Sequence, residues 1–288
     1  MRGDQKGMVE TDSVEEIIRM MNLSVPALEI QRIQTEHRLK LIRFWGIEKG
    51  SRILEIGCGQ GDTLAALAYA VGKGGFVYGI DCADESYGTP ETLGQARTRL
   101  QKGGLGRNLR MDFQVDVMSG TVGFKEDEFD AVVLSHCLWY LSGYRELADV
   151  LKRARLWGRK LHIAEWNPCI EHSGQLAHWQ AASIQAVCES FEEKSRSNIR
   201  SMFYPSEIER AVLEGGWQLE ESADVFSEGM QDGIWEASAA VHFYPDKIMN
   251  HPVMPDKLKR LLLAQIEALK KQTRITPMSV YCVNAARE

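Results

Sequence analysis

The sequence predicts an α/β protein whose mostly parallel sheet is covered by helices on both faces. Three observations carry this prediction. Short β-rich apolar runs alternate with helical patterns from residue 51 onward, the runs lie at the spacing of crossover connections, and several end on an acidic residue. Strands joined through helices pair in parallel with right-handed crossovers. Ligands of such sheets bind at the carboxyl ends of the strands, so these acids mark the expected site.

Five strands and three helices are expected between residues 52 and 166. The strands are placed at 52–57, 75–81, 109–117, 129–136 and 160–166, with helices at 63–71, 90–102 and 143–157. The second helix has the clearest limits, because Pro90 suits a first helical turn and Gly103 and Gly104 end the pattern.

The flanks of this region break the alternation. Two helix patterns, 12–22 and 26–45, precede the first strand, and residues 167–205 insert a largely helical segment after the fifth. Further on, a strand is expected at 217–226, helix near 255–272 and a last strand at 278–285. Without repeats or a low-complexity linker, the sequence predicts a helical cap (1–45) and one domain (46–288) with a lid insertion at about 167–205.

Charge argues against a nucleic-acid partner. The formal net charge is −6 and the isoelectric point is near 5.7. The densest positive cluster, RARLWGRK at 153–160, lies at the end of a helix pattern, where cations interact well with the helix dipole. We therefore expect no basic binding face and no nucleic-acid substrate.

Cysteine usage and hydropathy predict a cytoplasmic protein. The six cysteines form no C-x-x-C pair and no zinc spacing, which suits free thiols in a reducing compartment. The polar start, MRGDQKGMVE, lacks the apolar core of a signal peptide. No run of about 18 apolar residues occurs, so no membrane partner is expected.

The stretch LEIGCGQGD, residues 54–62, carries the strongest chemical signal. A glycine turn between a strand and a helix lets a ligand approach the main chain. The spacing here is G-x-G-x-G at 57–61, whereas a dinucleotide site requires G-x-G-x-x-G. Glu55 and Asp62 flank the turn and would repel a pyrophosphate. A ligand that brings positive charge, such as S-adenosylmethionine with its sulfonium and ammonium groups, fits better than a nicotinamide cofactor.

The motif E-x-G-C-G-x-G after the first strand resembles motif I of the class I S-adenosylmethionine-dependent methyltransferases. The resemblance covers about residues 40–166 at motif level. It implies a Rossmann-like sheet of seven strands, the last antiparallel, with 217–226 and 278–285 as the remaining two. It also implies S-adenosylmethionine as cofactor and methyl transfer as activity.

The same resemblance assigns residues to the cofactor. Asp81 ends the second strand, where the family binds both ribose hydroxyls, and Asp116 ends the third, where the family binds the adenine edge. The implied set is Glu55, Gly57, Cys58, Gly59, Asp81, Cys82, Asp116, Val117 and Ser135.

Several of these residues have alternative roles. Asp81 is also suited to cap its own turn, and Glu55 to tie down the glycine loop. Asp112 and Asp127 compete with Asp116 for the adenine role. Cys58 could simply be a small residue that a tight turn tolerates. Cys82 could pack on the adenine without any chemistry of its own.

Methyl transfer from a sulfonium needs alignment and exclusion of water, and a base only when the nucleophile must lose a proton. His136, after the fourth strand, and Glu165, at the end of the fifth, are the candidate catalytic residues. Each has an alternative as a pocket-lining or structural group. His172 and His178, six residues apart, define neither a shared helical face nor a metal site, and no metal is expected.

The stretch SHCLWYL (135–141) bears on the acceptor. It contains no N-P-P-Y or D-P-P-Y, which argues against amino-methyltransferases of adenine, cytosine or glutamine. Trp139, Tyr140 and Trp166 predict a pocket for a small aromatic or apolar acceptor, unless they simply pack the lid. Around SHCLWY the chain is loosely similar to fungal methyltransferases of secondary metabolism.

Two other functions stay open at this point. A methyltransferase fold can use bound S-adenosylmethionine to catalyse cyclisation or rearrangement without methyl transfer, and it can serve as a non-catalytic cofactor-binding partner. The sequence leaves the acceptor atom and the oligomeric state open.

Overall fold

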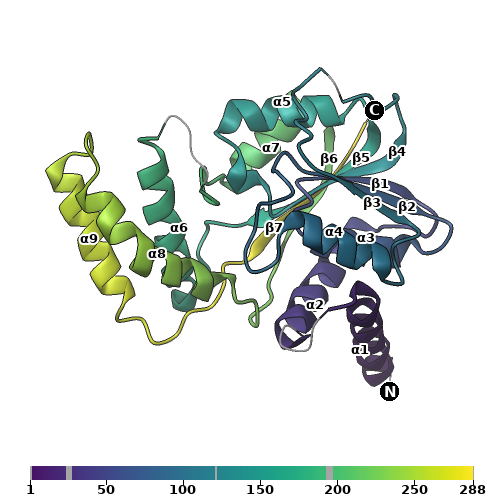
Figure 1. The fold of residues 1–288 in the computed structure, drawn as a ribbon, viewed down its shortest axis with the longest axis horizontal. Coiled ribbons are helices and arrows are strands. Elements are labelled where there is room, and N and C mark those ends of the chain that lie inside the picture. Colours follow the sequence, from purple (N-terminus) through teal and green to yellow (C-terminus); the bar gives the residue numbers. More distant parts are fainter. Residues whose placement is uncertain (1, 24–27, 121, 193–196, 288) are drawn as a thin grey trace.

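A seven-stranded sheet organises the molecule in the computed structural model, which describes residues 2–23, 28–120, 122–192 and 197–287, and side chains from residue 12 (Figure 1). Its strand order is β3-β2-β1-β4-β5-β7-β6. The strands are β1 Arg52–Ile56, β2 Phe76–Ile80, β3 Leu109–Asp112, β4 Phe129–Ser135, β5 Gly158–Trp166, β6 Gln218–Val225 and β7 Val280–Ala286. The first five are parallel, and β7 runs antiparallel to both β5 and β6. The predicted fold class is confirmed.

Helices cover both faces of this sheet. In Figure 1, α5 and α7 lie over one face, and α3 and α4 lie over the other together with α1 and α2. Their bounds are α1 Arg2–Met21, α2 Leu28–Trp45, α3 Asp62–Val71, α4 Leu93–Lys102, α5 Tyr144–Ala154 and α7 Pro205–Glu214. Helix α5 illustrates why these helices pack on the sheet. Its buried residues recur at helical spacing and so form one apolar face: Leu147, Val150, Leu151 and Ala154.

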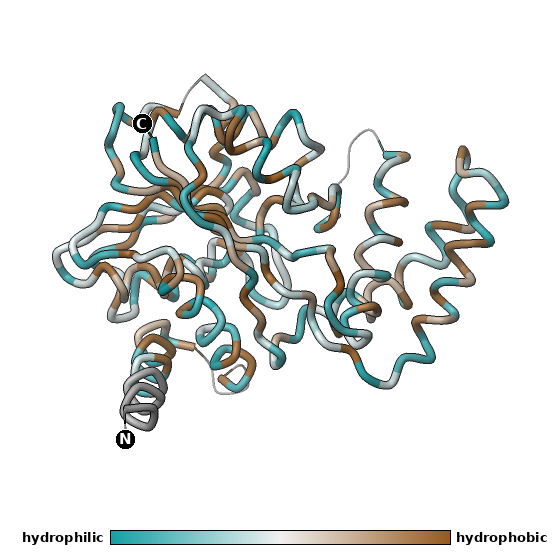
Figure 2. Tube along the Cα trace, turned by 180° about the vertical axis from the view of Figure 1, so that it is seen from behind, coloured by the Kyte–Doolittle hydropathy of each residue, from teal (hydrophilic) through white to brown (hydrophobic). Residues whose placement is uncertain are grey.

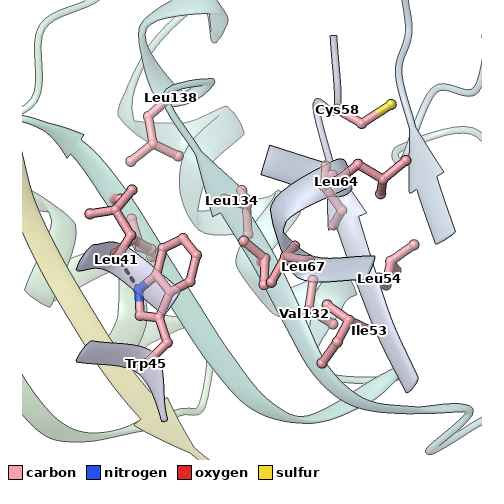
Figure 3. Close-up of a cluster of buried hydrophobic side chains, with 14 of the residues drawn as sticks. Leu41, Trp45, Ile53, Leu54, Cys58, Leu64, Leu67, Val132, Leu134 and Leu138 are labelled. Atoms are coloured by element: carbon pink, nitrogen blue, oxygen red, sulfur yellow. Dashed lines mark hydrogen bonds between the residues drawn. The ribbon is translucent and has the colours of Figure 1, made fainter. Parts of the chain in front are cut away.

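The main core lies between the sheet and these helices. Strand β4 is buried along most of its length, as expected for a parallel strand covered on both sides. Figure 3 shows Leu41 and Trp45 of α2 beside the core residues Leu134 and Leu138. The Trp45 indole donates a hydrogen bond of 3.4 Å to the Ile163 carbonyl, so α2 is packed directly onto the sheet.

A separate group of helices, which we call the lid helices, lies beyond the carboxyl end of β5 (Figure 1). It consists of α6 Leu176–Glu189, α8 Asp232–Met249 and α9 Asp256–Leu269. These helices pack on one another around their own apolar cluster, which includes Ile184, Ile248 and Ile266. Figure 2 shows the contrast: apolar residues concentrate in the strands, whereas they alternate with polar ones along the lid helices.

The observed elements correct several expected limits. Strand β3 ends at Asp112 rather than 117, because the chain turns at Gln114, whose φ of 58° is left-handed. Helix α4 begins after Thr92, whose hydroxyl accepts from the Gln95 N–H, rather than at residue 90. The first helix pattern, expected at 12–22, belongs to a longer helix that starts at Arg2. The start of the second, at 26, lies outside the described residues.

The lid helices extend beyond residues 167–205, the segment that the sequence predicts as a lid insertion. Only α6 comes from that segment, while α8 and α9 come from the connection between β6 and β7. The sequence analysis did not predict α8. This helix contains Pro245, and a proline inside a helical pattern usually indicates that the helix ends. Across the described part of the chain, no helix combines the length and the hydropathy needed to cross a bilayer.

Candidate active site

The glycine loop between β1 and α3 is built from left-handed backbone. Gly57, Gly59 and Gly61 have φ values of 75°, 51° and 83°. A Cβ at position 57 would lie 2.6 Å from the Cys137 Cβ, and one at position 61 would lie 2.6 Å from the Leu100 Cδ1. A Cβ at position 59 would meet nothing within 4 Å. The two outer glycines therefore permit close packing, and the middle one presents bare backbone to open space.

Asp81 follows β2 and links two loops. Its Oδ2 accepts from the Gly59 N–H and its Oδ1 from the Ala83 N–H, both at 2.9 Å. The bond to Ala83 is the turn cap that the sequence left as an alternative. Because each carboxylate oxygen carries two lone pairs, Asp81 can cap the turn and still accept from ribose hydroxyls.

Asp116 lies in the loop after β3, beside Asp81. The loop is held there because the Val115 N–H donates to the Asp81 carbonyl at 2.9 Å. Asp116 is exposed and bonds its own loop through the Met118 N–H at 2.8 Å, whereas Val117 is buried. Cys82, next to Asp81, is exposed at the same corner.

The two competing acids are engaged elsewhere. Asp112 accepts from Arg110 at 2.7 Å and from the Tyr78 hydroxyl. Asp127 pairs with Arg287 at 2.8 Å. Asp116 is thus the acid whose side chain stays beside Asp81.

The buried Glu55 and the half-buried Arg38 lie at the other end of the glycine loop. Glu55 on β1 is 1% exposed, and burial raises the pKa of its carboxyl well above the usual value. Among the described residues, neither its Oε2 nor the Nε of Arg38 has a hydrogen-bond partner. Arg38 belongs to α2, and its guanidinium lies 3.9 Å from Asp62 at the start of α3. Gln31 of the same helix donates to Asp62 at 3.1 Å, so α2 lies over the loop.

The small residues next to these groups are buried and unreactive. Burial raises the pKa of the Cys58 thiol well above its usual value, so it stays protonated. Ser135, at the end of β4, is buried and accepts from the Thr63 hydroxyl at 3.4 Å. Both pack the floor of the loop.

His136 comes directly after β4 with a left-handed φ of 51°. Its Nε2 lies 3.1 Å from the Nε2 of His37 on α2, and its Nδ1 lies 3.9 Å from a Glu165 oxygen. Burial lowers the pKa of His136 to about 3, and the charge of Arg38 adds to this effect. The imidazole is therefore neutral at physiological pH.

Glu165 has both carboxylate oxygens occupied by backbone groups. Its Oε2 accepts from the N–H groups of Leu138 at 2.8 Å and Trp139 at 3.4 Å, and its Oε1 accepts from the Trp166 N–H at 2.9 Å. Burial raises the pKa of Glu165 to about 7, although these bonds act in the opposite direction. The side chain anchors the short 3-10 helix η2 Leu138–Tyr140.

The rings of Trp166 and His37 lie against His136, and Trp166 in turn contacts His178. The Trp166 ring centroid lies 4.8 Å from that of His136, 6.3 Å from that of His37 and 5.0 Å from that of His178 on α6. Trp139 also contacts His178 and, like Trp166, is buried, whereas Tyr140 is 40% exposed. His172 is exposed and contacts Phe226 instead. Within the described residues, no cluster of His, Cys, Asp and Glu is arranged to hold a metal ion.

The sequence reasoning missed His37, Arg38 and Ser227. A signal for the first two exists, since Gln31, Gln34 and His37 recur at helical spacing and are buried on α2. Buried polar groups need partners, so a polar stripe on a buried helix face indicates a site. Ser227 carries no comparable signal.

Comparisons with known proteins agree with this geometry. Residues 53–155 match the family model described as a methyltransferase domain. Methyltransferase phomM' from Diaporthe leptostromiformis is 31% identical over 160 residues, which is 48% of this chain and 41% of that protein. Methyltransferase phomM from the same fungus is 27% identical over 233 residues, 67% of this chain and 60% of that protein. The chain spans about half the length of these curated relatives.

One solved structure is similar over nearly its whole length. The cyclopropane-fatty-acyl-phospholipid synthase-like protein from Lactobacillus casei superposes with a TM-score of 0.84 at 29% identity. The match covers 96% of this chain and 99% of that one.

Fold and site define the class of protein: the chain contains a class I S-adenosylmethionine-dependent methyltransferase domain. Within that family, it is distantly similar to the fungal phomM methyltransferases. The cofactor of the family is S-adenosylmethionine, and the residues present fit it. The unpartnered Glu55 oxygen and Arg38 nitrogen suit the ammonium and carboxylate of its methionine portion, and the open backbone at Gly59 leaves room.

Proposed function

We propose that this protein transfers a methyl group from S-adenosylmethionine to a small, partly aromatic or apolar acceptor. The observation that carries the proposal is the position of His136. It follows β4 at the same edge of the sheet as the glycine loop, and the rings of Trp166 and His37 lie against it. A small acceptor suits this enclosure better than a macromolecule does.

The cofactor side divides into three contacts. Asp81 would accept from the ribose hydroxyls, and Asp116, with Cys82 and Val117 nearby, would meet the adenine. Glu55 and Arg38 would hold the methionine portion. Bound S-adenosylmethionine supplies an electrophilic methyl group, and the task of the surrounding residues is to align it and exclude water.

The acceptor side centres on His136, with Trp139, Tyr140 and Trp166 as lining residues. The His136 imidazole is neutral at physiological pH, because burial lowers its pKa to about 3. Glu165 acts through the turn it anchors, since its oxygens are already bonded to main-chain N–H groups. We regard it as a positioning residue.

We also propose that the N-terminal cap, residues 1–45, is part of the working site. Its contacts support this: α2 reaches Asp62 through Gln31, and Gln34 donates to Asp232 of the lid at 3.2 Å. One domain, 46–288, would then carry the lid, with the cap joining the lid to the glycine loop. The cytoplasmic location stays a prediction from the cysteine pattern.

The proposal is tested by product formation. The full chain is incubated with S-adenosylmethionine and a panel of phenols, aromatic acids and amines, and S-adenosylhomocysteine is measured together with product mass. We expect S-adenosylhomocysteine to accumulate in step with a product heavier by one methyl group. Turnover of an acceptor without S-adenosylhomocysteine would instead indicate a cyclisation or rearrangement.

A further inference from the structure

A chain of hydrogen bonds from distant parts of the sequence ends on His136. The Lys40 ammonium on α2 donates to the Ser227 hydroxyl at 3.0 Å. The same hydroxyl oxygen lies 3.0 Å from Nδ1 of His37. The Nε2 of His37 lies 3.1 Å from the Nε2 of His136. His37 is fully buried, so each of its two ring nitrogens relies on one of these partners.

The donors favour one direction for this chain. An ammonium only donates, so Ser227 accepts from Lys40. Of the two groups at bonding distance from the Ser227 oxygen, His37 Nδ1 is the one able to accept the hydroxyl hydrogen. A neutral imidazole carries one N–H, which places the His37 proton on Nε2. His37 then donates to His136, whose Nε2 accepts.

A second observation leads to the same assignment for His136. With Nε2 accepting, its proton is on Nδ1. Among the described residues, this Nδ1 atom has no hydrogen-bond partner, and it faces a Glu165 oxygen at 3.9 Å. A carboxylate oxygen favours a hydrogen on the nitrogen that faces it. Burial opposes a second proton on the ring, and Arg38 and His178 add to this effect, so the imidazole stays neutral.

We propose that Lys40, Ser227 and His37 are positioning residues that lock His136 as the neutral Nδ1–H tautomer. Its Nε2 lone pair is then occupied by His37 and its Nδ1 carries the proton, so His136 has no free lone pair with which to act as a general base. This consequence rests on the proposed methyl transfer, whereas the tautomer does not.

The tautomer is measured directly by long-range proton–nitrogen correlation spectra of the full chain labelled with ¹⁵N-histidine. The signals of His136 and His37 are assigned with His136→Asn and His37→Asn. We expect a protonated Nδ1 and an unprotonated Nε2 on His136, and the reverse on His37. A His136 ring protonated at Nε2, or at both nitrogens, would overturn the proposal.

Variants of half-buried residues test the lock without disturbing the core. Ser227→Ala and Lys40→Met should each shift the tautomer ratio of His136 by about fivefold toward Nε2–H, the change that one hydrogen bond produces. The matched control is Ser238→Ala, because that serine also contacts a histidine ring, His242, at 3.3 Å but on the exposed side of α8. An unchanged ratio in Ser227→Ala would contradict the chain of bonds.

His37 itself is tested by a conservative pair. His37→Gln keeps an amide N–H that can donate to His136, and His37→Leu does not. We expect His136 to keep its Nδ1–H tautomer in the first variant and to lose it in the second. The same spectrum in both variants would show that His37 fills space only.

Discussion

The cofactor half and the acceptor half of the site are built in different ways. The cofactor half comes from loops after successive strands, and its central bond joins Gly59 to Asp81, 22 positions apart. The acceptor half joins His37 to His136 and Ser227, which are 99 and 190 positions away. A local motif therefore encodes the cofactor, whereas the surroundings of the acceptor depend on the packing of α2 and the lid.

The largest effect should separate two glycines of the same loop. Gly57→Ala should lower the free energy of unfolding by about 3 kcal/mol, because left-handed strain is joined by overlap with Cys137. Gly59→Ala should cost about 1 kcal/mol, since its Cβ meets open space. The second variant should instead weaken S-adenosylmethionine binding. Urea unfolding and calorimetric titration measure the two effects, and equal destabilisation would break the distinction.

A second effect, of similar size, is a pH-dependent change in the free energy of unfolding that arises from Glu165 in the acceptor half. Folding raises the pKa of Glu165 from 4.5 to about 7. The buried carboxyl therefore binds its proton more tightly in the folded protein, and this stabilises the fold fully below about pH 4.5. The contribution, about 3 kcal/mol, is lost as the pH rises through about 7.

Glu165→Gln removes this contribution. We expect the stability advantage of the wild type over this variant to shrink between about pH 5 and about pH 8. The low pKa of His136 acts in the opposite direction, but it is common to both proteins and cancels in the difference. Glu36→Gln, an exposed change on α2, is the control and should show a constant offset. A constant offset for Glu165→Gln too would contradict the raised pKa.

The smallest effect tests whether α2 also belongs to the cofactor half. Arg38→Met should weaken S-adenosylmethionine binding about tenfold, as expected for the loss of one charge-assisted hydrogen bond. Arg145→Met changes an exposed arginine on α5 and should leave the affinity unchanged. If Arg38→Met and Arg145→Met bind S-adenosylmethionine with the same affinity, α2 contributes to the acceptor half alone.

Features that depend on local sequence could be predicted, as in the cofactor half of the site. Alternating apolar runs and acids at strand ends locate the parallel strands, because strand and helix periods are local properties. The loop carrying Asp116 followed from the family motif, although β3 proved shorter than its apolar run. These features require no knowledge of distant contacts.

Features set by tertiary contact were not predicted. Helix α8 contains Pro245 and gains its stability from packing on α6 and α9. His136 is bonded to His37 of α2, and His37 is bonded to Ser227 in the loop after β6; no spacing in the sequence links these residues. The role of Glu165 as an anchor likewise depends on where the turn at Leu138 lies.

The central claim is that the glycine loop and Asp81 bind S-adenosylmethionine. Calorimetric titration of the full chain with S-adenosylmethionine, S-adenosylhomocysteine and NAD tests it most directly, beside Asp81→Ala and the exposed control Asp149→Ala on α5. We predict micromolar binding of the first two ligands, no heat from NAD, and a loss of about tenfold or more in Asp81→Ala alone. Binding of NAD, or unchanged affinity in Asp81→Ala, would contradict the account.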